Sequence, residues 1–229
     1  MIIPKINFPF YGIIIVLSVF IGMYYIYFNL KKDGYKNKQI LMYFIMYIVF
    51  AFVCGKMYTS LVYGEESFLY AGLSSYVGLV CVVISAIIFE RIIPTDGSIT
   101  KYTILSLPLV YGLTKVACSI VGCCGGIPYN GLFKIKYINT LDIWQFPIQI
   151  VETIVFIILF ILLNKFKRNK YINYISLLIV CIIKFLLDFL RYEHIKLLIS
   201  RNQIFSIILF FIIIIVFIIN KFKTSSNKN

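Results

Sequence analysis

Long apolar runs alternate with short basic or polar segments along the whole chain. Most runs come close to the ~20 residues that an α-helix needs to cross the hydrocarbon core of a bilayer. We therefore expect an all-α, polytopic membrane protein that folds as a single transmembrane domain over residues 1–229. Its seven predicted transmembrane helices lie near residues 9–29, 40–62, 69–91, 102–122, 146–164, 171–191 and 203–221.

One connection between these runs, residues 123–145, is much longer than the others. It begins with GGIPYNG, whose glycine, proline and asparagine residues are typical of turns. A short alternating run, LFKIKY, follows and favours a strand. We expect this segment to form a small external hairpin or cap, and a plain surface loop is the alternative.

Composition agrees with a membrane location and excludes an ordinary soluble domain. Hydrophobic residues make up 61% of the chain, and the mean hydropathy is +0.95. The formal net charge of +13 does not indicate a nucleic-acid partner, because the basic residues lie mainly in short segments that flank the apolar runs. The positive-inside rule places KKDGYKNK, KFKRNK and the tail from Lys221 in the cytoplasm. The amino terminus is then outside.

A polar, glycine-rich patch interrupts the apolar pattern between Lys115 and Gly126, with the sequence KVACSIVGCCGG. On a helix, offsets of three and seven residues return to nearly the same direction, so Lys115, Cys118 and Gly122 share one face. Gly122 and the Gly125-Gly126 pair allow the backbone to leave the helix or to approach a ligand closely. The pattern favours a helix that ends at a polar cavity.

Ionisable and amide side chains also lie inside other predicted spans, where charge is costly and a functional role is the default expectation. Gln149 and Glu152 lie one turn apart in the fifth span. Lys184, Asp188 and Arg191 share a face of the sixth span. An ion-paired stripe with a structural role is the alternative for these three residues.

Two further candidates have simple alternatives. Lys56 in the second span can extend its ammonium group outward along the helix, and Tyr76 in the third can belong to the interfacial aromatic belt. The predicted topology nevertheless brings many polar residues into the outer half of the membrane, where one chamber would collect them. These residues are Tyr11, Lys56, Tyr76, Lys115, Cys118, Gln149, Glu152, Asp188 and Arg191. Cations facing carboxylates suit an anionic phospholipid headgroup, whose phosphate accepts charge-assisted hydrogen bonds.

The six cysteines do not indicate a metal site. The chain has a single histidine, no CxxC pair and no mixed Cys/His ligand spacing, so zinc is not expected. Cys54, Cys81 and Cys181 lie in apolar runs, where a free cysteine behaves as a small hydrophobic residue. We expect no metal and no cofactor.

Six short segments are distributed along most of the chain, in the order FPFYG, GKMY, GLSSYVGLV, KVACSIVGCCGG, FPIQIVE and KFLLDFLR. In this order they resemble the motifs of the prolipoprotein diacylglyceryl transferase family. The resemblance implies seven membrane helices with an active chamber that opens to the outer leaflet of a bacterial plasma membrane. It also implies transfer of diacylglycerol from phosphatidylglycerol to a cysteine of a lipoprotein precursor.

Two of the family's motifs are altered here. Tyr76 stands where the family usually has a histidine. The signature that usually reads Gly-Arg-x-Gly-Asn, with a following Asn-Gly-Glu, has Lys115 for its arginine and cysteine, at Cys118 and Cys123, for asparagine and glutamate. The Pro-x-Gln-x-x-Glu element survives in FPIQIVE. The chain therefore resembles a divergent paralogue of a Gly-Cys-Cys type.

The resemblance implies roles for the residues that remain. Glu152 is the best remaining base for an acceptor thiol or hydroxyl, and Arg191 with Lys56 or Lys115 would stabilise the leaving phosphate. Cys123 or Cys124 is an alternative nucleophile that would form a covalent intermediate, and a packing role for this pair is the simpler interpretation.

The predicted site follows from these arguments. Its catalytic residues are Glu152, Arg191, Tyr76 and Lys115. Its substrate-binding residues are Tyr11, Lys56, Cys118, Gly122, Cys123, Cys124, Gln149 and Asp188. The predicted function is transfer of a diacylglyceryl group from an anionic glycerophospholipid to a protein or peptide cysteine or another acceptor. A non-catalytic lipid-binding or accessory protein on the same scaffold is the alternative, because a fold does not fix a function.

Overall fold

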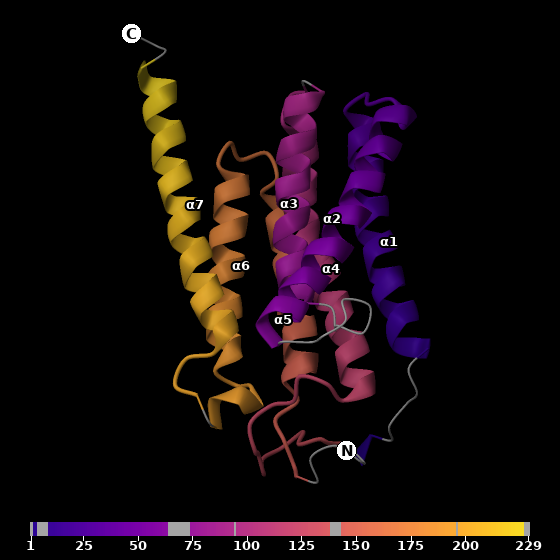
Figure 1. Ribbon diagram of the computed structural model, residues 1–229, viewed down its shortest axis with the longest axis vertical. Coiled ribbons are helices and arrows are strands. Elements are labelled where there is room, and N and C mark those ends of the chain that lie inside the picture. The colour runs from indigo at the N-terminus through magenta and orange to yellow at the C-terminus, as the bar shows by residue number, and fades with distance from the viewer. Residues whose placement is uncertain are drawn as a thin grey trace. The chain divides into compact units, whose positions relative to one another are not determined.

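The structure is a computed structural model that describes residues 2–3, 9–63, 74–93, 95–137, 143–195 and 197–226 (Figure 1). These residues form seven α-helices, one 3₁₀ helix and two strands of two residues each, which confirms the all-α prediction. The helices are α1 (Pro9–Lys32), α2 (Asn37–Tyr63), α3 (Ser75–Ile92), α4 (Ser98–Val121), α5 (Ile148–Lys165), α6 (Ile172–Asp188) and α7 (Arg201–Ser226). The remaining elements are β1 (Ile2–Ile3), β2 (Lys136–Tyr137) and the 3₁₀ helix η1 (Tyr192–Ile195).

Five of the described helices are long and apolar enough to cross a membrane. They cover Phe10–Lys32, Asn37–Leu61, Ser98–Val121, Ile148–Lys165 and Arg201–Lys223, and each matches a predicted span in position and length. As described, α3 and α6 contain 18 and 17 residues, at the short end of the roughly 17–25 residues of a transmembrane helix. Residues 64–73, which include the predicted start of the third span, lie outside the described residues. The architecture of seven spans therefore stays a prediction.

The chain divides into two compact units, which we describe separately. The first unit is Met1–Ile13 with Lys115–Asn229, and the second is Ile14–Thr114. In the second unit α2 and α3 pack along each other, and they approach closely at Gly78, where a Cβ atom would lie 2.9 Å from the Ala51 carbonyl oxygen. The buried hydroxyls of Tyr43 and Thr103 share a hydrogen bond of 2.6 Å, which satisfies both polar groups inside this unit.

Two carboxylates hold the start of α4. Asp96 accepts hydrogen bonds from the amide and the hydroxyl of Ser98, at 3.2 and 2.9 Å. Glu90 accepts from the amide and the hydroxyl of Thr100, at 2.9 and 2.6 Å. The first amides of a helix have no partner within the helix, and its amino-terminal end is electropositive, so both contacts stabilise α4. The Tyr35 hydroxyl also donates to Asp96, which ties the α1–α2 connection to this helix start.

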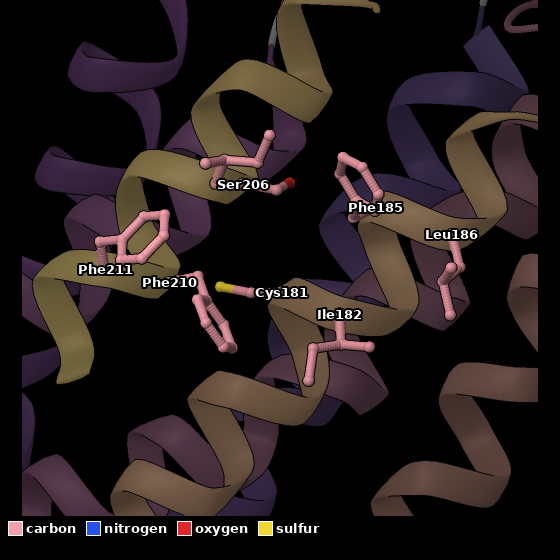
Figure 2. A pocket seen from close by; sticks show the side chains of 8 residues that line it. Cys181, Ile182, Phe185, Leu186, Ser206, Phe210 and Phe211 are labelled. Atoms are coloured by element: carbon pink, nitrogen blue, oxygen red, sulfur yellow. The ribbon is translucent and has the colours of Figure 1, made fainter.

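In the first unit α6 and α7 lie side by side (Figure 1). Ser200 and Gln203 form a capping box at the start of α7, with amide to side-chain distances of 3.0 and 3.1 Å. A groove of about 280 Å³ lies between the two helices, and Figure 2 shows the side chains that line it. It is lined by Cys181, Ile182, Phe185, Leu186, Ser206, Ile207, Phe210 and Phe211. These side chains are almost all apolar, so the groove does not suit a charged headgroup.

The long connection between α4 and α5 contains β2, which falls within the alternating run that predicted a strand. β2 pairs with β1 in parallel, with Ile2 opposite Lys136 and Ile3 opposite Tyr137. Hairpin strands are antiparallel, so the parallel pair of β1 and β2 is not a hairpin. Single bridges also join Gly126 to Arg191 and Pro128 and Ile135 to Gln145. The described part of this connection is therefore fastened to the residues that follow α6 and to the residues that precede α5.

Candidate functional site

A buried cluster of charged side chains lies in the first unit. Its members are Lys115 on α4, Glu152 on α5, Lys184 and Asp188 on α6, and Arg191 just after α6. Glu152 and Asp188 are 0% exposed, and the most exposed members, Lys115 and Arg191, are only 5% exposed. Charged residues are rarely buried this completely unless they are paired, so the cluster is a specific feature of the fold.

Glu152 is the centre of the cluster. The Nη2 atom of Arg191 lies 2.8 Å from each of its carboxylate oxygens. The Nζ atom of Lys184 lies 3.3 Å from Oε1, and the Nζ atom of Lys115 lies 3.6 Å from Oε2. A carboxylate offers about four lone-pair sites. The contacts with these three cations are therefore enough to occupy both oxygens of Glu152.

Asp188 completes the cluster from the last turn of α6. Its Oδ1 atom lies 2.9 Å from Lys184 Nζ and 3.0 Å from Arg191 Nε. The Ser200 hydroxyl donates a hydrogen bond to its other oxygen. The shared face that the spacing of Lys184, Asp188 and Arg191 predicted is therefore confirmed, and it is an ion-paired stripe.

The composition of the cluster suits an anion. Among the described residues, Lys115, Lys184 and Arg191 contact the two carboxylates Glu152 and Asp188. Lysine and arginine form charge-assisted hydrogen bonds with phosphate oxygens as well as with carboxylates, so these cations could also bind a phosphate or another anion.

The polar patch forms a sharp turn at the end of α4. The helix ends at Val121, and Gly122 follows in a left-handed conformation with φ of +78°. The Gly122 amide donates to the Cys118 carbonyl at 2.9 Å, and a Cβ atom on Gly122 would lie 2.7 Å from the Tyr137 ring. Glycine suits such a position because it lacks the Cβ atom that strains other residues there. The prediction that a helix ends within this patch is confirmed.

The two glycines that follow allow a close approach of the chain to itself. A Cβ atom would lie 2.1 Å from Gln145 Oε1 at Gly125 and 2.2 Å from the Phe146 carbonyl oxygen at Gly126. Gln149 fixes the same turn from α5, because its Nε2 donates to the Cys123 carbonyl at 2.8 Å. The described contacts therefore give Gln149 and both glycines a role in shaping the site.

The turn brings three cysteines together. The sulfur atoms of Cys118, Cys123 and Cys124 all lie within 4.8 Å of one another. Cys118 is buried, Cys123 is half-buried and Cys124 is exposed. Four residues separate Cys118 from Cys123, and Cys124 follows directly, which matches no familiar ligand motif. Only the reversal of the chain at Gly122 brings them together, so the sequence did not predict this cluster.

Electrostatics distinguish Cys124 from its neighbours. The pKa of the Cys124 thiol lies well below its usual range, because the other two thiols donate hydrogen bonds to its sulfur. The positive charges of Lys115 and Arg191 add to this effect. The lowered pKa favours a thiolate at Cys124. Cys124 also has a positive φ of 58°, which is uncommon for a residue other than glycine.

The other predicted site residues have different surroundings. Tyr11, near the start of α1, lies within electrostatic range of Lys115 and of the three cysteines. Lys56 and Tyr76 belong to the second unit. The Lys56 ammonium lies 5.1 Å from the centre of the Phe52 ring, and Tyr76 packs edge-on against Tyr111 with ring centres 6.4 Å apart. That Lys56 and Tyr76 join the ionic cluster stays a prediction.

Two members of the polar network were not among the predicted site residues. Lys184 shares a face with Asp188, and its spacing is the signal that identifies it. Ser200 reaches Asp188 from the connection before α7. Its only mark in the sequence is the Ser-x-x-Gln pattern of a helix start, so its contact with Asp188 could not be predicted.

Comparison with known proteins adds one finding. A family model described as prolipoprotein diacylglyceryl transferase matches residues 1–219. No curated protein matches the chain. The matched range contains every member of the ionic cluster and all three clustered cysteines.

Proposed function

The chain belongs to the prolipoprotein diacylglyceryl transferase family, and on that premise we propose that it transfers a diacylglyceryl group from an anionic glycerophospholipid to a cysteine thiol. Phosphatidylglycerol is the proposed donor, and a lipoprotein precursor or a cysteine-containing peptide is the proposed acceptor. The observation that carries this proposal is the buried cluster, in which Lys115, Lys184 and Arg191 all contact Glu152. An anionic headgroup is a ligand that such a group of cations suits.

The proposed reaction exchanges one bond for another. The acceptor sulfur forms a bond to the glycerol carbon that carries the phosphate, and the bond between that carbon and the phosphate oxygen breaks. The headgroup phosphate leaves with the bonding electrons, and the thiol proton goes to a base. Catalysis therefore requires cations near the leaving phosphate and a proton acceptor near the thiol.

Arg191 and Lys115 are the proposed partners of the leaving phosphate. A guanidinium is planar and offers paired donors that match two phosphate oxygens. Contacts with Glu152 and Asp188 fix the orientation of the Arg191 guanidinium before a substrate arrives. Such preorganised donors stabilise developing negative charge without rearranging during the reaction.

Glu152 is the proposed proton acceptor. Its carboxylate contacts both Lys115 and Arg191, so it lies beside the proposed phosphate position. Its lone pairs are occupied by the cations, and a negative phosphate would compete for the same cations. We propose that Glu152 takes the acceptor proton while the leaving phosphate, bound to Arg191 and Lys115, shares these cations with it.

The proposed setting is a bacterial plasma membrane, with the amino terminus outside and the site open to the outer leaflet. Tyr11, Gln149, Lys56 and Tyr76 are proposed to bind or orient the substrates from the helices that carry them. A second candidate function is that of a non-catalytic lipid-binding protein. Tyr76 favours it, because tyrosine replaces a histidine of the family motif and is a poor base near neutral pH.

Reconstitution separates the two functions. Purified protein in vesicles containing labelled phosphatidylglycerol is mixed with a cysteine-containing lipoprotein-precursor peptide, and the peptide is analysed by mass spectrometry. Transfer predicts a diacylglyceryl mass increase that is absent from the same peptide with serine in place of cysteine. The same reaction with vesicles of phosphatidylethanolamine tests whether transfer requires phosphatidylglycerol as the donor. Lipid binding without any modified peptide would support the accessory function instead.

A further inference from the structure

Three thiols converge at the end of α4, and the proposed transfer does not use them as a set. Their sulfur atoms lie within 4.8 Å of one another, which is close enough for all three to coordinate one metal ion. We propose that Cys118, Cys123 and Cys124 form a binding site for a thiophilic metal ion, Zn²⁺ or Cu⁺. This revises the sequence interpretation, which expected no metal.

The geometry of the turn supports the proposal. Zinc–sulfur bonds of about 2.3 Å in a tetrahedral site place the sulfurs about 3.8 Å apart. The three sulfurs need to close by at most about 1 Å from their present separation, which small side-chain rotations provide. Cys118 is fixed on the helix, and the Gln149 hydrogen bond to the Cys123 carbonyl fixes the turn. The site is therefore largely formed before an ion binds.

Binding of the ion would itself deprotonate the thiols, because metal ions are coordinated by thiolates and displace their protons. Three thiolates with a divalent ion carry one negative charge. Lys115 lies one turn before Cys118 on the same helix, where its positive charge would offset that of the complex.

The donor set limits which ion can bind. Thiolates select zinc and monovalent copper over magnesium or calcium, which require oxygen ligands. Zn²⁺ prefers four ligands, so three cysteines would leave one position for a small external ligand such as water or a thiol. Cu⁺ would bind the three sulfurs alone. Because Cys124 is exposed, an ion can reach the site.

A spectroscopic titration tests the site without depending on transfer. Metal-free, reduced protein in detergent is titrated with Cd²⁺, whose thiolate complexes absorb in the ultraviolet. We expect saturation at about one equivalent, with an absorbance that fits three thiolates. Competition with Zn²⁺ and with Cu⁺ then identifies the preferred ion. Cys118→Ser and Cys124→Ser should each lower the affinity by more than the roughly 10–100-fold lost when an outer partner of a metal ligand is removed.

Matched control variants show whether the titration signal comes from the three clustered cysteines. Cys54→Ser removes a thiol of the second unit and should leave the titration unchanged. Thermal unfolding of each variant verifies its fold, and the exposed position of Cys124 makes its serine variant the mildest change. The proposal is overturned if the reduced wild-type protein takes up no more Cd²⁺ than a variant with all three cysteines replaced by serine. It is equally overturned if Cys54→Ser abolishes the signal.

Discussion

At the scale of single residues, Arg191 links the two carboxylates of the buried cluster. It follows the end of α6 by three residues, and its amide donates to the Asp188 carbonyl at 3.0 Å. This turn directs Nη2 to Glu152 and Nε toward Asp188. Because lysine has a single ammonium group, it cannot reproduce both contacts and also offer a fork to a phosphate.

Arg191→Lys should therefore reduce transfer while leaving the protein folded. Loss of a donor to developing negative charge typically lowers kcat by about 10²–10³-fold. Arg168→Lys, which changes an exposed arginine of the same unit, is the matched control and should retain wild-type turnover. Turnover of labelled phosphatidylglycerol measures both. Equal activity of the two variants would rule out a role for Arg191 at the leaving phosphate.

Direct transfer and a covalent route through a cysteine predict different variants to be inactive. In the direct route, Glu152→Gln should lower turnover by about 10²–10⁴-fold, the usual range for loss of a general base. The Cys123→Ala/Cys124→Ala protein should be affected far less. We favour the direct route, because a thioether formed on the enzyme is a poor leaving group. A diacylglyceryl adduct on either cysteine, formed and consumed at the catalytic rate, would show that the covalent route is correct.

The same glutamate substitution tests the cluster as a structural unit. Removing one partner of a buried ion pair commonly costs about 3–5 kcal/mol, because the opposite charge stays buried without compensation. Glu152→Gln should lower the thermal unfolding temperature for this reason. Phospholipid vesicles should partly restore it if an anionic headgroup binds the cations. No change on adding anionic lipid would contradict headgroup binding at this cluster.

At the scale of elements, the sequence predicted features that depend on neighbouring residues. The end of α4 at the glycine-rich patch and the shared face of α6 follow from local spacing. The parallel pairing of β1 with β2 joins residues more than 100 positions apart and involves two residues from each strand. Strands this short carry no periodicity, so their partners could not be inferred. The cysteine cluster was missed for a related reason, because it depends on the direction of one turn.

The glycine pair after this turn offers a matched comparison. At Gly126 a new Cβ atom would meet the Phe146 carbonyl of the main chain, whereas at Gly125 it would meet the end of the Gln145 side chain. A backbone group has less freedom to move away. Gly126→Ala should therefore destabilise the protein by about 1–3 kcal/mol, the usual range for overpacking, and Gly125→Ala by less. Thermal unfolding in detergent measures the difference, and equal losses would contradict this ranking.

The start of α4 predicts a dependence of stability on pH. The pKa of Asp96 lies below its ordinary value of 3.8, chiefly because the Tyr35 hydroxyl donates to the carboxylate, and Ser98 contributes further. A lowered pKa in the folded state means that ionised Asp96 stabilises the fold above pH 3.8 and that this contribution is lost as the pH falls below it. Asp96→Asn should lower the unfolding temperature at pH 7, and the gap from wild type should narrow toward pH 3.

Tyr35→Phe is the control for this experiment. It removes the largest cause of the lowered pKa and leaves the contacts between Asp96 and Ser98 at the helix start. Its pH dependence should fall between that of the wild type and that of Asp96→Asn. A gap that stays constant from pH 7 to pH 3 would show that ionisation of Asp96 does not contribute to stability.

At the scale of the whole molecule, five apolar helices and the family match make this a multi-pass membrane protein. Span length is a local property of the sequence, so these helices could be predicted within a few residues. The short, charged α6 is harder to assign, because Lys184 and Asp188 are stabilised by partners distant in sequence. Such partners become visible only in the folded chain. The orientation of the protein in the membrane is predicted from a different feature, the basic connections between the helices.

The orientation that we expect places the amino terminus outside and the tail from Lys221 in the cytoplasm. The connections KKDGYKNK and KFKRNK and the tail carry clustered lysine and arginine, which favour retention on the cytoplasmic side. A cysteine tag after Asn229 should therefore resist an impermeant thiol reagent in intact cells and react after the membrane is opened. A tag before Met1 should react in both cases. Labelling of the Asn229 tag in intact cells would reverse the topology, and the ionic cluster would then be on the wrong side to receive an outer-leaflet lipid.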